Sequence, residues 1–342
     1  MQLGTILLTA INAVCPIILL ILLGYVLKNK KFITKEFVKV GNNLVFKVCL
    51  PCMLFVNVYK IESFSAVQWD IVGYAIAVIL VIFVLGFFTA VLTTKVPERR
   101  GVIWQCTFRS NFAIIGLSLA EALGGSKATG VAAVVSAFTI PIFNIMGVIA
   151  LTVFINKSGA LSKSFKNIIL NIVKNPLIIG VAVGLASLGI RTWQMNVFGE
   201  LVFSFERDLK FLYTAVNNLK VLATPLALIV LGGQFEFSAV KGLLKDITVG
   251  TVWRIVITPL IGIGGAVLLS NYTNVLSCGV NEYPALIALF GSPVAVSSAV
   301  MAGAMNNDEQ LAAQLVVWTS ICSVVTVFVT ACILMAAGLL PV

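Results

Sequence analysis

The sequence is poor in charge and contains no histidine. Only 11% of the 342 residues are charged, whereas a soluble globular chain carries about 25%. So few charges cannot cover a surface that faces water, and a soluble fold is therefore excluded. The absence of histidine removes the commonest general base and a leading metal ligand. We therefore expect no enzymatic activity and no cofactor.

The seven cysteines are an odd number, and all of them lie in apolar sequence. Cys49 and Cys52 have the C-x-x-C spacing that is typical of redox and metal motifs. A structural zinc site needs four ligands, and no second close pair of cysteines exists in the chain. We interpret the cysteines as packing residues and predict no metal site.

Long apolar runs make up most of the chain. A helix needs about 20 residues to span the hydrocarbon core of a membrane, and 60% of this sequence is hydrophobic. The pattern predicts an all-α integral membrane protein with ten transmembrane helices. The predicted spans are 5–27, 38–59, 71–94, 101–124, 129–155, 168–189, 211–234, 247–270, 283–304 and 310–338.

Lysine and arginine are distributed unequally between the two sets of loops. Fourteen lie in the loops after spans 1, 3, 5 and 7, and five lie on the opposite side. Positively charged loops face the cytoplasm, so both termini are expected outside the cell membrane. The net charge of +10 is then a consequence of topology, and no nucleic-acid partner is expected.

Three motifs recur in the same order in the two halves of the chain. A proline followed by a glycine eight residues later occurs within spans 1 and 6, and NNLVFKVCLP in span 2 resembles NNLKVLATP in span 7. The third pair is SNFAIIG in span 4 and SPVAVSS in span 9. Five spans per half require the second half to be inverted, a plan typical of secondary transporters. We predict repeats at 1–156 and 168–342, joined by a cytoplasmic linker at 157–167.

Spans 4 and 9 each contain a polar interruption. Span 4 carries Arg109, Ser110 and Asn111, and span 9 carries Gly291, Ser292 and Pro293 in a row. Broken helices near the membrane centre expose backbone groups that bind ligands, while an ordinary kink is the alternative. We predict that these six residues form a substrate site.

Cations outnumber acids within the spans, which favours an anionic substrate. Arg109 is the first candidate because its planar fork can hold a carboxylate; the alternative is a pair with Glu121. Lys47 is a further candidate, and Lys220 is interpreted as reaching the membrane surface. Arg254 is interpreted as a structural charge on the cytoplasmic side, near Asp246. Finally, Pro51 and Pro225 are predicted to bend spans 2 and 7.

Taken together, these motifs resemble the auxin efflux carrier family of secondary transporters. GNNLVFKVCLP, SNFAIIGLSLAEALGG, KNPLIIG, TPLALIVLGGQF and SPVAVSSAVMAGAMNND match family segments in order. The resemblance implies scaffold helices 1, 2, 6 and 7, transport helices 3–5 and 8–10, crossing helices 4 and 9, and an elevator-like motion. It implies that Asn111 is the crossover asparagine and that Gly116 belongs to the same Asn-x4-Gly motif, as a hinge.

The resemblance also implies a small organic anion as substrate. Arg109-Ser110 stands where plant members have Leu-Pro, so we expect a small carboxylate such as malate or malonate rather than auxin. Alternatives are a sodium-coupled symporter of the bile-acid-transporter type and a membrane sensor without transport. The expected partners are the anion and the lipid bilayer. The sequence leaves open uniport, exchange and coupling to H⁺ or Na⁺, and a homodimer is one of the possible assemblies.

Overall fold

The computed structural model describes residues 3–60, 69–155, 174–236, 240–273 and 275–340. Apart from one isolated β-bridge, the regular structure in these residues is helical. The predicted linker 157–167 and the start of the sixth predicted span lie outside the described residues.

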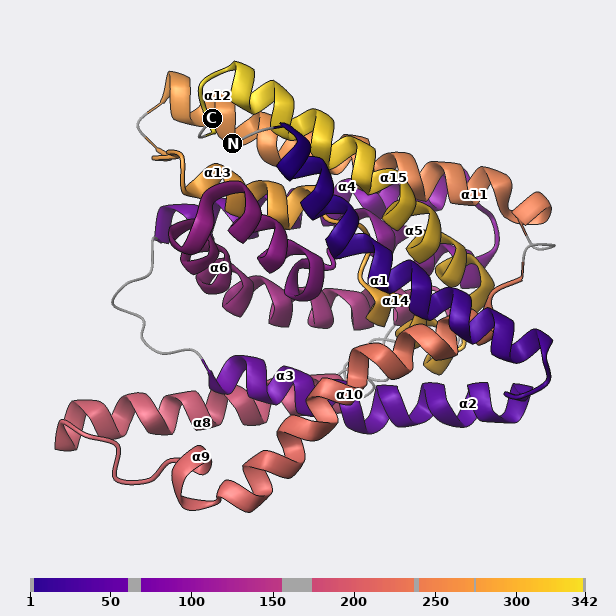
Figure 1. The fold of residues 1–342 in the computed structure, drawn as a ribbon, viewed down its shortest axis with the longest axis horizontal. Helices are drawn as coiled ribbons and strands as arrows, with labels where there is room; N and C mark the ends of the chain where they lie inside the picture. The colour runs from indigo at the N-terminus through magenta and orange to yellow at the C-terminus, as the bar shows by residue number, and fades with distance from the viewer. Residues whose placement is uncertain (1–2, 61–68, 156–173, 237–239, 274, 341–342) are drawn as a thin grey trace, which may run out of the picture.

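The helices follow the predicted spans closely (Figure 1). The continuous ones are α1 (Leu3–Asn29), α4 (Trp69–Thr93), α8 (Pro176–Phe198), α10 (Lys210–Gln234) and α15 (Glu309–Ala336), with the short α9 (Phe205–Asp208) before α10. The second predicted span comprises α2 (Lys35–Leu44), a π-helical segment (Val45–Cys49) and α3 (Leu50–Tyr59). The eighth comprises α11 (Val240–Val252), two π-helical segments (Trp253–Ile257 and Leu260–Gly264) and α12 (Gly265–Tyr272).

Two of the predicted spans are divided. Span 4 becomes α5 (Pro97–Phe108), a π-helical segment (Phe112–Gly116) and the start of α6 (Leu117–Val153), which kinks at Gly125 with φ 67°. Span 9 becomes α13 (Glu282–Leu286), a π-helical segment (Ile287–Gly291) and α14 (Val296–Ala304). Among the described residues, seven helical stretches are long and apolar enough to cross a membrane, against the ten spans predicted.

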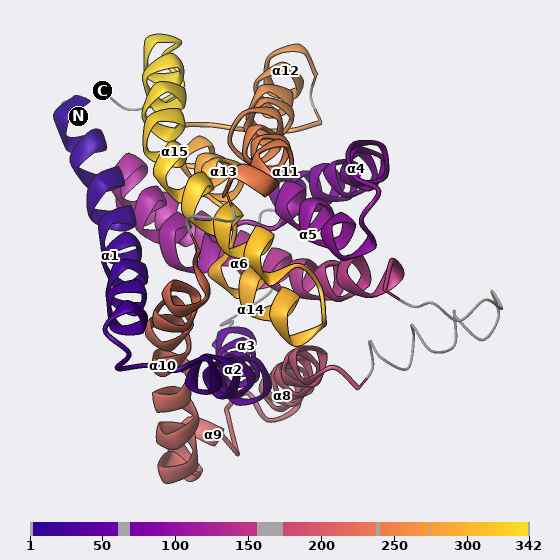
Figure 2. The same ribbon diagram turned by 90° about the vertical axis from the view of Figure 1, so that its right-hand side faces the viewer.

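The elements form two groups that lie one above the other. In Figures 1 and 2, α2, α3, α8, α9 and most of α10 lie below a larger body of α4–α6 and α11–α15. Helix α1 contacts both groups, since it packs against α10 and α15. The start of α1 and the end of α15 lie at the same end of the molecule (Figures 1 and 2).

Glycines allow close contacts between helices of the lower group and between α10 of this group and α1. A Cβ added at Gly24 of α1 would lie 2.1 Å from the carbonyl oxygen of Ile229 in α10. A Cβ at Gly180 of α8 would lie 2.6 Å from the carbonyl oxygen of Pro51 in α3. Helices in membranes gain packing energy from small residues that let their backbones approach. The α1–α10 and α3–α8 pairs are therefore in contact at backbone distance.

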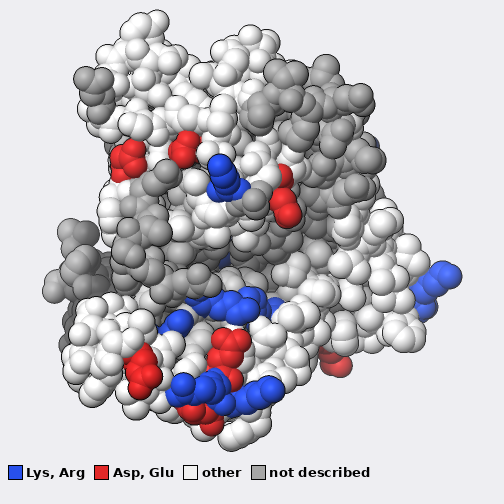
Figure 3. Space-filling model, turned by 60° about the vertical axis from the view of Figure 1, so that its left-hand side comes forward, with Lys and Arg blue, Asp and Glu red and all other residues white. Residues whose placement is uncertain are grey.

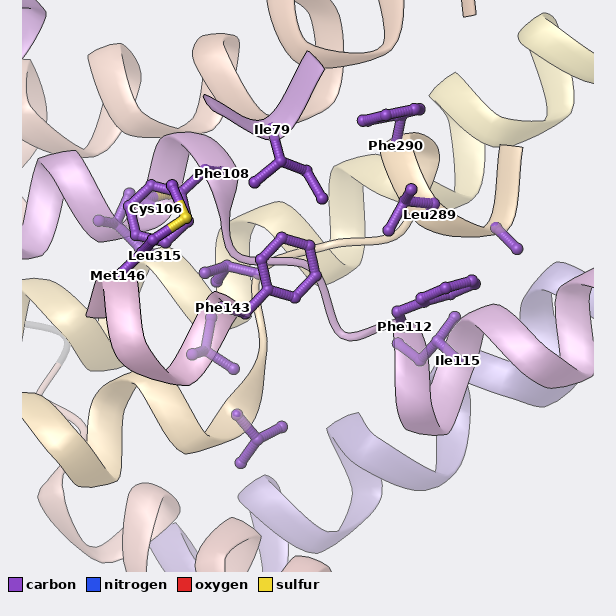
Figure 4. Close-up of a cluster of buried hydrophobic side chains, with 14 of the residues drawn as sticks. Ile79, Cys106, Phe108, Phe112, Ile115, Phe143, Met146, Leu289, Phe290 and Leu315 are labelled. Carbon is purple, nitrogen blue, oxygen red and sulfur yellow. The ribbon is translucent and has the colours of Figure 1, made fainter. Parts of the chain in front are cut away.

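The apolar core lies around the two interruptions. Figure 4 shows Phe108, Phe112, Phe143, Leu289 and Phe290 converging from α5, α6 and the segments beside the breaks. These side chains are at most 3% exposed. Tight packing on every side leaves the interrupted backbone little freedom.

Candidate functional site

The two interruptions have extended backbone between helical ends. Arg109 has φ −84° and ψ 108°, whereas Ser292 has φ −65° and ψ 148°. In the second interruption Pro293 explains the geometry, because the residue before a proline avoids the helical region. The first interruption has no proline, so its extended backbone needs a tertiary partner.

That partner is the second interruption. The amide of Asn111 donates to the carbonyl of Pro293 at 2.8 Å, and the amide of Ala295 donates to that of Arg109 at 3.4 Å. Ser110 and Val294 form the isolated antiparallel bridge. Unpaired backbone groups are costly in an apolar interior. Each interruption therefore supplies hydrogen bonds that the other lacks.

The side chain of Arg254, from the π-helical segment Trp253–Ile257, lies against the end of the segment Ile287–Gly291, which precedes the second interruption. Its side chain is 0% exposed, and it donates to the carbonyls of Leu289, Phe290 and Ser292 at 2.9 to 3.1 Å. The last carbonyls of a helix carry partial negative charge, which the guanidinium offsets.

Arg254 is therefore a structural charge, as the sequence suggested, but its partners are carbonyl groups at the second interruption rather than Asp246. Asp246 instead pairs with Arg99 at 3.1 Å. The sequence holds no signal for the real contact, because the carbonyls that Arg254 meets belong to backbone far along the chain.

Arg109 is buried beside the first interruption and is 3% exposed. Its Nη2 donates to Asn144 Oδ1 at 2.7 Å and to Ser297 Oγ at 2.9 Å, and its Nη1 contacts the sulfur of Met301. Gly147 makes room for the guanidinium, since a Cβ there would lie 2.7 Å from Nη1. No carboxylate in the described part of the chain pairs with Arg109, and the alternative partner Glu121 is exposed.

A cavity of about 50 Å³ lies against Arg109, Ser110 and Asn111. Its other walls come from α3, α10, α6 and the start of α14, and they include Met53, Thr224, Ala227, Asn144 and Ser297. The Asn111 side-chain nitrogen and the Ser110 hydroxyl are buried and have no hydrogen-bond partner in the part of the chain that the structure describes. Such groups are costly unless a ligand or water completes them. The cavity therefore offers a guanidinium and two unused polar groups to a small ligand.

Three of the six residues predicted for the site line this cavity, and three do not. Gly291, Ser292 and Pro293 are buried behind it. The Ser292 hydroxyl donates to the carbonyl of Ala288 at 2.6 Å, so it stabilises the helix end. Asn144 and Ser297 were missed; an asparagine within an apolar span is a signal that could have identified the first of them.

The remaining predicted residues lie away from the cavity walls. Lys47 is exposed within the π-helical segment Val45–Cys49, and Pro51 is the second residue of α3, which directly follows that segment. Pro225 lies inside α10, which continues through it. Gly116 serves close packing, because a Cβ there would lie 2.9 Å from the carbonyl oxygen of Ala288.

A second cavity of about 640 Å³ lies at the other end of α2 and α10. Its lining includes Lys35, Lys39, Asn42, Gln234 and Glu309. Three buried side chains lie, along the chain, between residues that line one cavity and residues that line the other. They are Phe46, Val230 and Val300. Asn42 also donates to the carbonyl of Val300 at 3.2 Å. This apolar layer separates the large cavity from the Arg109 cavity.

These features define a helical, multi-pass membrane protein with two paired helix interruptions and a buried cation at its centre. The family model described as "Membrane transport protein" matches residues 9–331. The chain belongs to this family, and the predicted resemblance to auxin efflux carriers is confirmed. A search of curated proteins found no match.

Proposed function

We propose that this protein is a secondary transporter of a small organic anion, with the Arg109 cavity as its substrate site. The observation that carries the proposal is the guanidinium of Arg109, which is 3% exposed and has no carboxylate partner among the described residues. A buried cation without a counter-charge is electrostatically unfavourable. An anionic ligand removes that cost when it binds.

A carboxylate suits the site better than a spherical anion. The planar guanidinium can present parallel N–H groups to the two oxygens of a carboxylate, provided that the anion replaces Asn144 or Ser297 as an acceptor for Nη2. The unpartnered Asn111 nitrogen and Ser110 hydroxyl on the same cavity are further donors. The cavity of about 50 Å³ has room for a few water molecules, so substrate entry requires it to widen. This favours small carboxylates such as malonate or malate over auxin.

Contacts related between the two halves support an inverted repeat of five helices each. Gly24 follows Pro16 by eight residues and contacts Ile229, which follows Pro225 by four. Gly184 follows Pro176 by eight and lies 3.2 Å, measured from an added Cβ, from the carbonyl oxygen of Phe55, which follows Pro51 by four. The same contact in both halves is what an inverted repeat produces. On this plan both termini lie outside the cell, as the loop charges predict.

The two groups of helices suit alternating access. The Arg109 cavity lies between α3 and α10 on one side and the interrupted helices on the other. The apolar layer of Phe46, Val230 and Val300 lies between it and the large cavity near the lysine-rich first loop. We propose that the interrupted helices cross at their backbone bridge and move as one body against a scaffold of α1–α3, α8 and α10. That motion carries the anion past the layer.

Uptake into proteoliposomes tests the substrate site. Purified protein is reconstituted and supplied with radiolabelled malonate, malate and a panel of other small carboxylates. We expect saturable uptake of at least one carboxylate and a loss of roughly 100-fold or more in kcat/KM for Arg109→Gln, because a buried charge-assisted contact is removed.

Arg100→Gln is the matched control, since Arg100 lies in the same helix, is partly exposed and is absent from the cavity walls. It should transport like the wild type. Wild-type protein that moves no carboxylate in the panel would refute the proposed substrate. Full activity in Arg109→Gln would refute the proposed site.

A further inference from the structure

Charged side chains in this molecule lie mostly at its surface. Figure 3 shows Lys, Arg, Asp and Glu side chains as separate groups on one face, among residues that carry no charge. The buried charged residues in the described part of the chain are Arg109, Asp246, Arg254 and Glu282. Of these, Arg109 alone lines the cavity of about 50 Å³. The charge that this cavity can neutralise is therefore that of one guanidinium.

The polar residues of the cavity wall belong to one body. Arg109, Ser110 and Asn111 form the first interruption, Asn144 lies in α6 and Ser297 lies in α14. The Nη2 atom of Arg109 joins the last two to the first interruption, because it donates to both of their side chains. A carboxylate in the cavity is therefore bound by the larger body alone.

The wall that α3 and α10 contribute is apolar by comparison. Its residues are Leu50, Met53, Leu54, Ala223, Thr224 and Ala227. Thr224 carries the one hydroxyl group among these side chains, and none of them is charged. Ile140 and Phe143 of α6 extend the apolar surface. A second carboxylate against this wall would be a buried charge without a partner, which is strongly unfavourable.

We propose that the anion bound in the Arg109 cavity carries a single negative charge and that its other end is uncharged. This inference rests on the proposed function and narrows the substrate of the same site. A small monocarboxylate meets the condition when its carboxylate faces Arg109 and its tail faces α3 and α10. A dicarboxylate such as malonate or malate meets it only as the monoanion, in which one of the two carboxyl groups is protonated.

The division of the wall also suits the proposed motion between the two groups of helices. The directional contacts of the anion, which are hydrogen bonds and the charge pair, all lie in the larger body. The contacts to α3 and α10 are apolar and have no preferred direction. The tail can therefore move along this wall while the carboxylate stays on Arg109.

Malonate and its monomethyl ester give the first test, because they differ by one charge at neutral pH. Their dissociation constants are measured from the thermal stabilisation of the purified protein in detergent. We expect the ester to bind at least about tenfold more tightly at neutral pH, where little malonate is monoanionic. At the second pKa of malonate, half of it is the monoanion, so the difference should fall to about twofold. The affinity for the ester, whose charge is constant over this range, is the control for effects of pH on the protein.

A second cation on the apolar wall gives the second test. Met53→Lys places an ammonium group on α3 at a residue that lines the cavity, and methionine and lysine have unbranched side chains of similar length. We expect this variant to reverse the preference, so that malonate binds several-fold more tightly than its ester at neutral pH. Met53→Gln, which is polar and uncharged at the same position, is the matched control and should keep the preference for the ester. Thr224→Lys on α10 replaces Met53→Lys if the latter does not fold.

The outcomes separate this inference from the proposed function. Malonate that binds the wild type at neutral pH as tightly as its ester, or more tightly, would overturn the single charge and leave the proposed carboxylate site intact. An unchanged preference in both lysine variants would overturn the assignment of the tail to the wall of α3 and α10. If no carboxylate stabilises the wild type or enters proteoliposomes, the proposed function fails and the inference fails with it.

Discussion

The two helix interruptions lie side by side but have different roles. The first carries its own cation, and Arg109, Ser110 and Asn111 all line the cavity. The second contributes backbone: its Ser292 hydroxyl is bonded to Ala288, and its cation, Arg254, comes from another helix. Each is next to a buried arginine. Arg109 lines the cavity and bonds the side chains of Asn144 and Ser297, whereas Arg254 bonds backbone carbonyl groups.

This difference separates binding from support within a fold whose halves resemble each other. Arg254 donates to three carbonyl groups through Nε and Nη2 and does not line the Arg109 cavity, although its buried Nη1 has no partner among the described residues. An arginine beside a cavity with unpartnered polar neighbours has the capacity to bind a ligand. The comparison predicts that changes at the second interruption reduce stability, whereas changes at the first reduce substrate affinity.

Replacement of Arg254 should have the largest effect. Arg254→Met leaves the carbonyls of Leu289, Phe290 and Ser292 without their buried donor. Each unsatisfied group costs about 1–3 kcal/mol, so we expect the free energy of unfolding to fall by about 3 kcal/mol or more, with transport lost as a consequence. Thermal unfolding in detergent measures this. An Arg254→Met protein with wild-type stability and lost transport would place Arg254 with the ligand instead.

Displacement of Arg109 should have an intermediate effect. A methyl group at Gly147 would lie 2.7 Å from the Arg109 guanidinium, so Gly147→Ala pushes the side chain out of position. We expect kcat/KM to fall roughly tenfold with little change in unfolding temperature. Gly130→Ala in the same helix meets nothing within 4 Å and is the control. Equal kinetics in the two variants would argue against the importance of the position of Arg109.

The two serines should give the smallest effects, in opposite measurements. Ser110→Ala removes a buried hydroxyl that has no partner among the described residues, so we expect KM to rise a few-fold at unchanged stability. Ser292→Ala removes the bond to Ala288, so we expect a loss of about 1 kcal/mol in stability at unchanged KM. Kinetics and thermal unfolding of both proteins test the comparison. The reverse outcome would exchange the two roles.

The helix boundaries and both interruptions could be predicted from local sequence. Apolar run length determines where helices lie, and the Gly-Ser-Pro at 291–293 forbids a regular helix there. The family was also predictable, because its motifs occur in order. In contrast, two sets of contacts arise from packing between distant segments. Arg254 donates to backbone carbonyls of the segment before the second interruption, and Arg109 donates to both Asn144 and Ser297. Such contacts leave no local pattern, which is why Ser292 was expected at the cavity and Ser297 was not.

The backbone bridge between Ser110 and Val294 has a consequence for biosynthesis. More than half of the chain separates the two residues, so the first interruption is synthesised long before its partner exists. Until then the amide of Asn111 has no backbone acceptor, although the hydrocarbon of a membrane offers none. The first half must therefore keep this segment near water or the insertion machinery, and its final burial waits for the ninth helix.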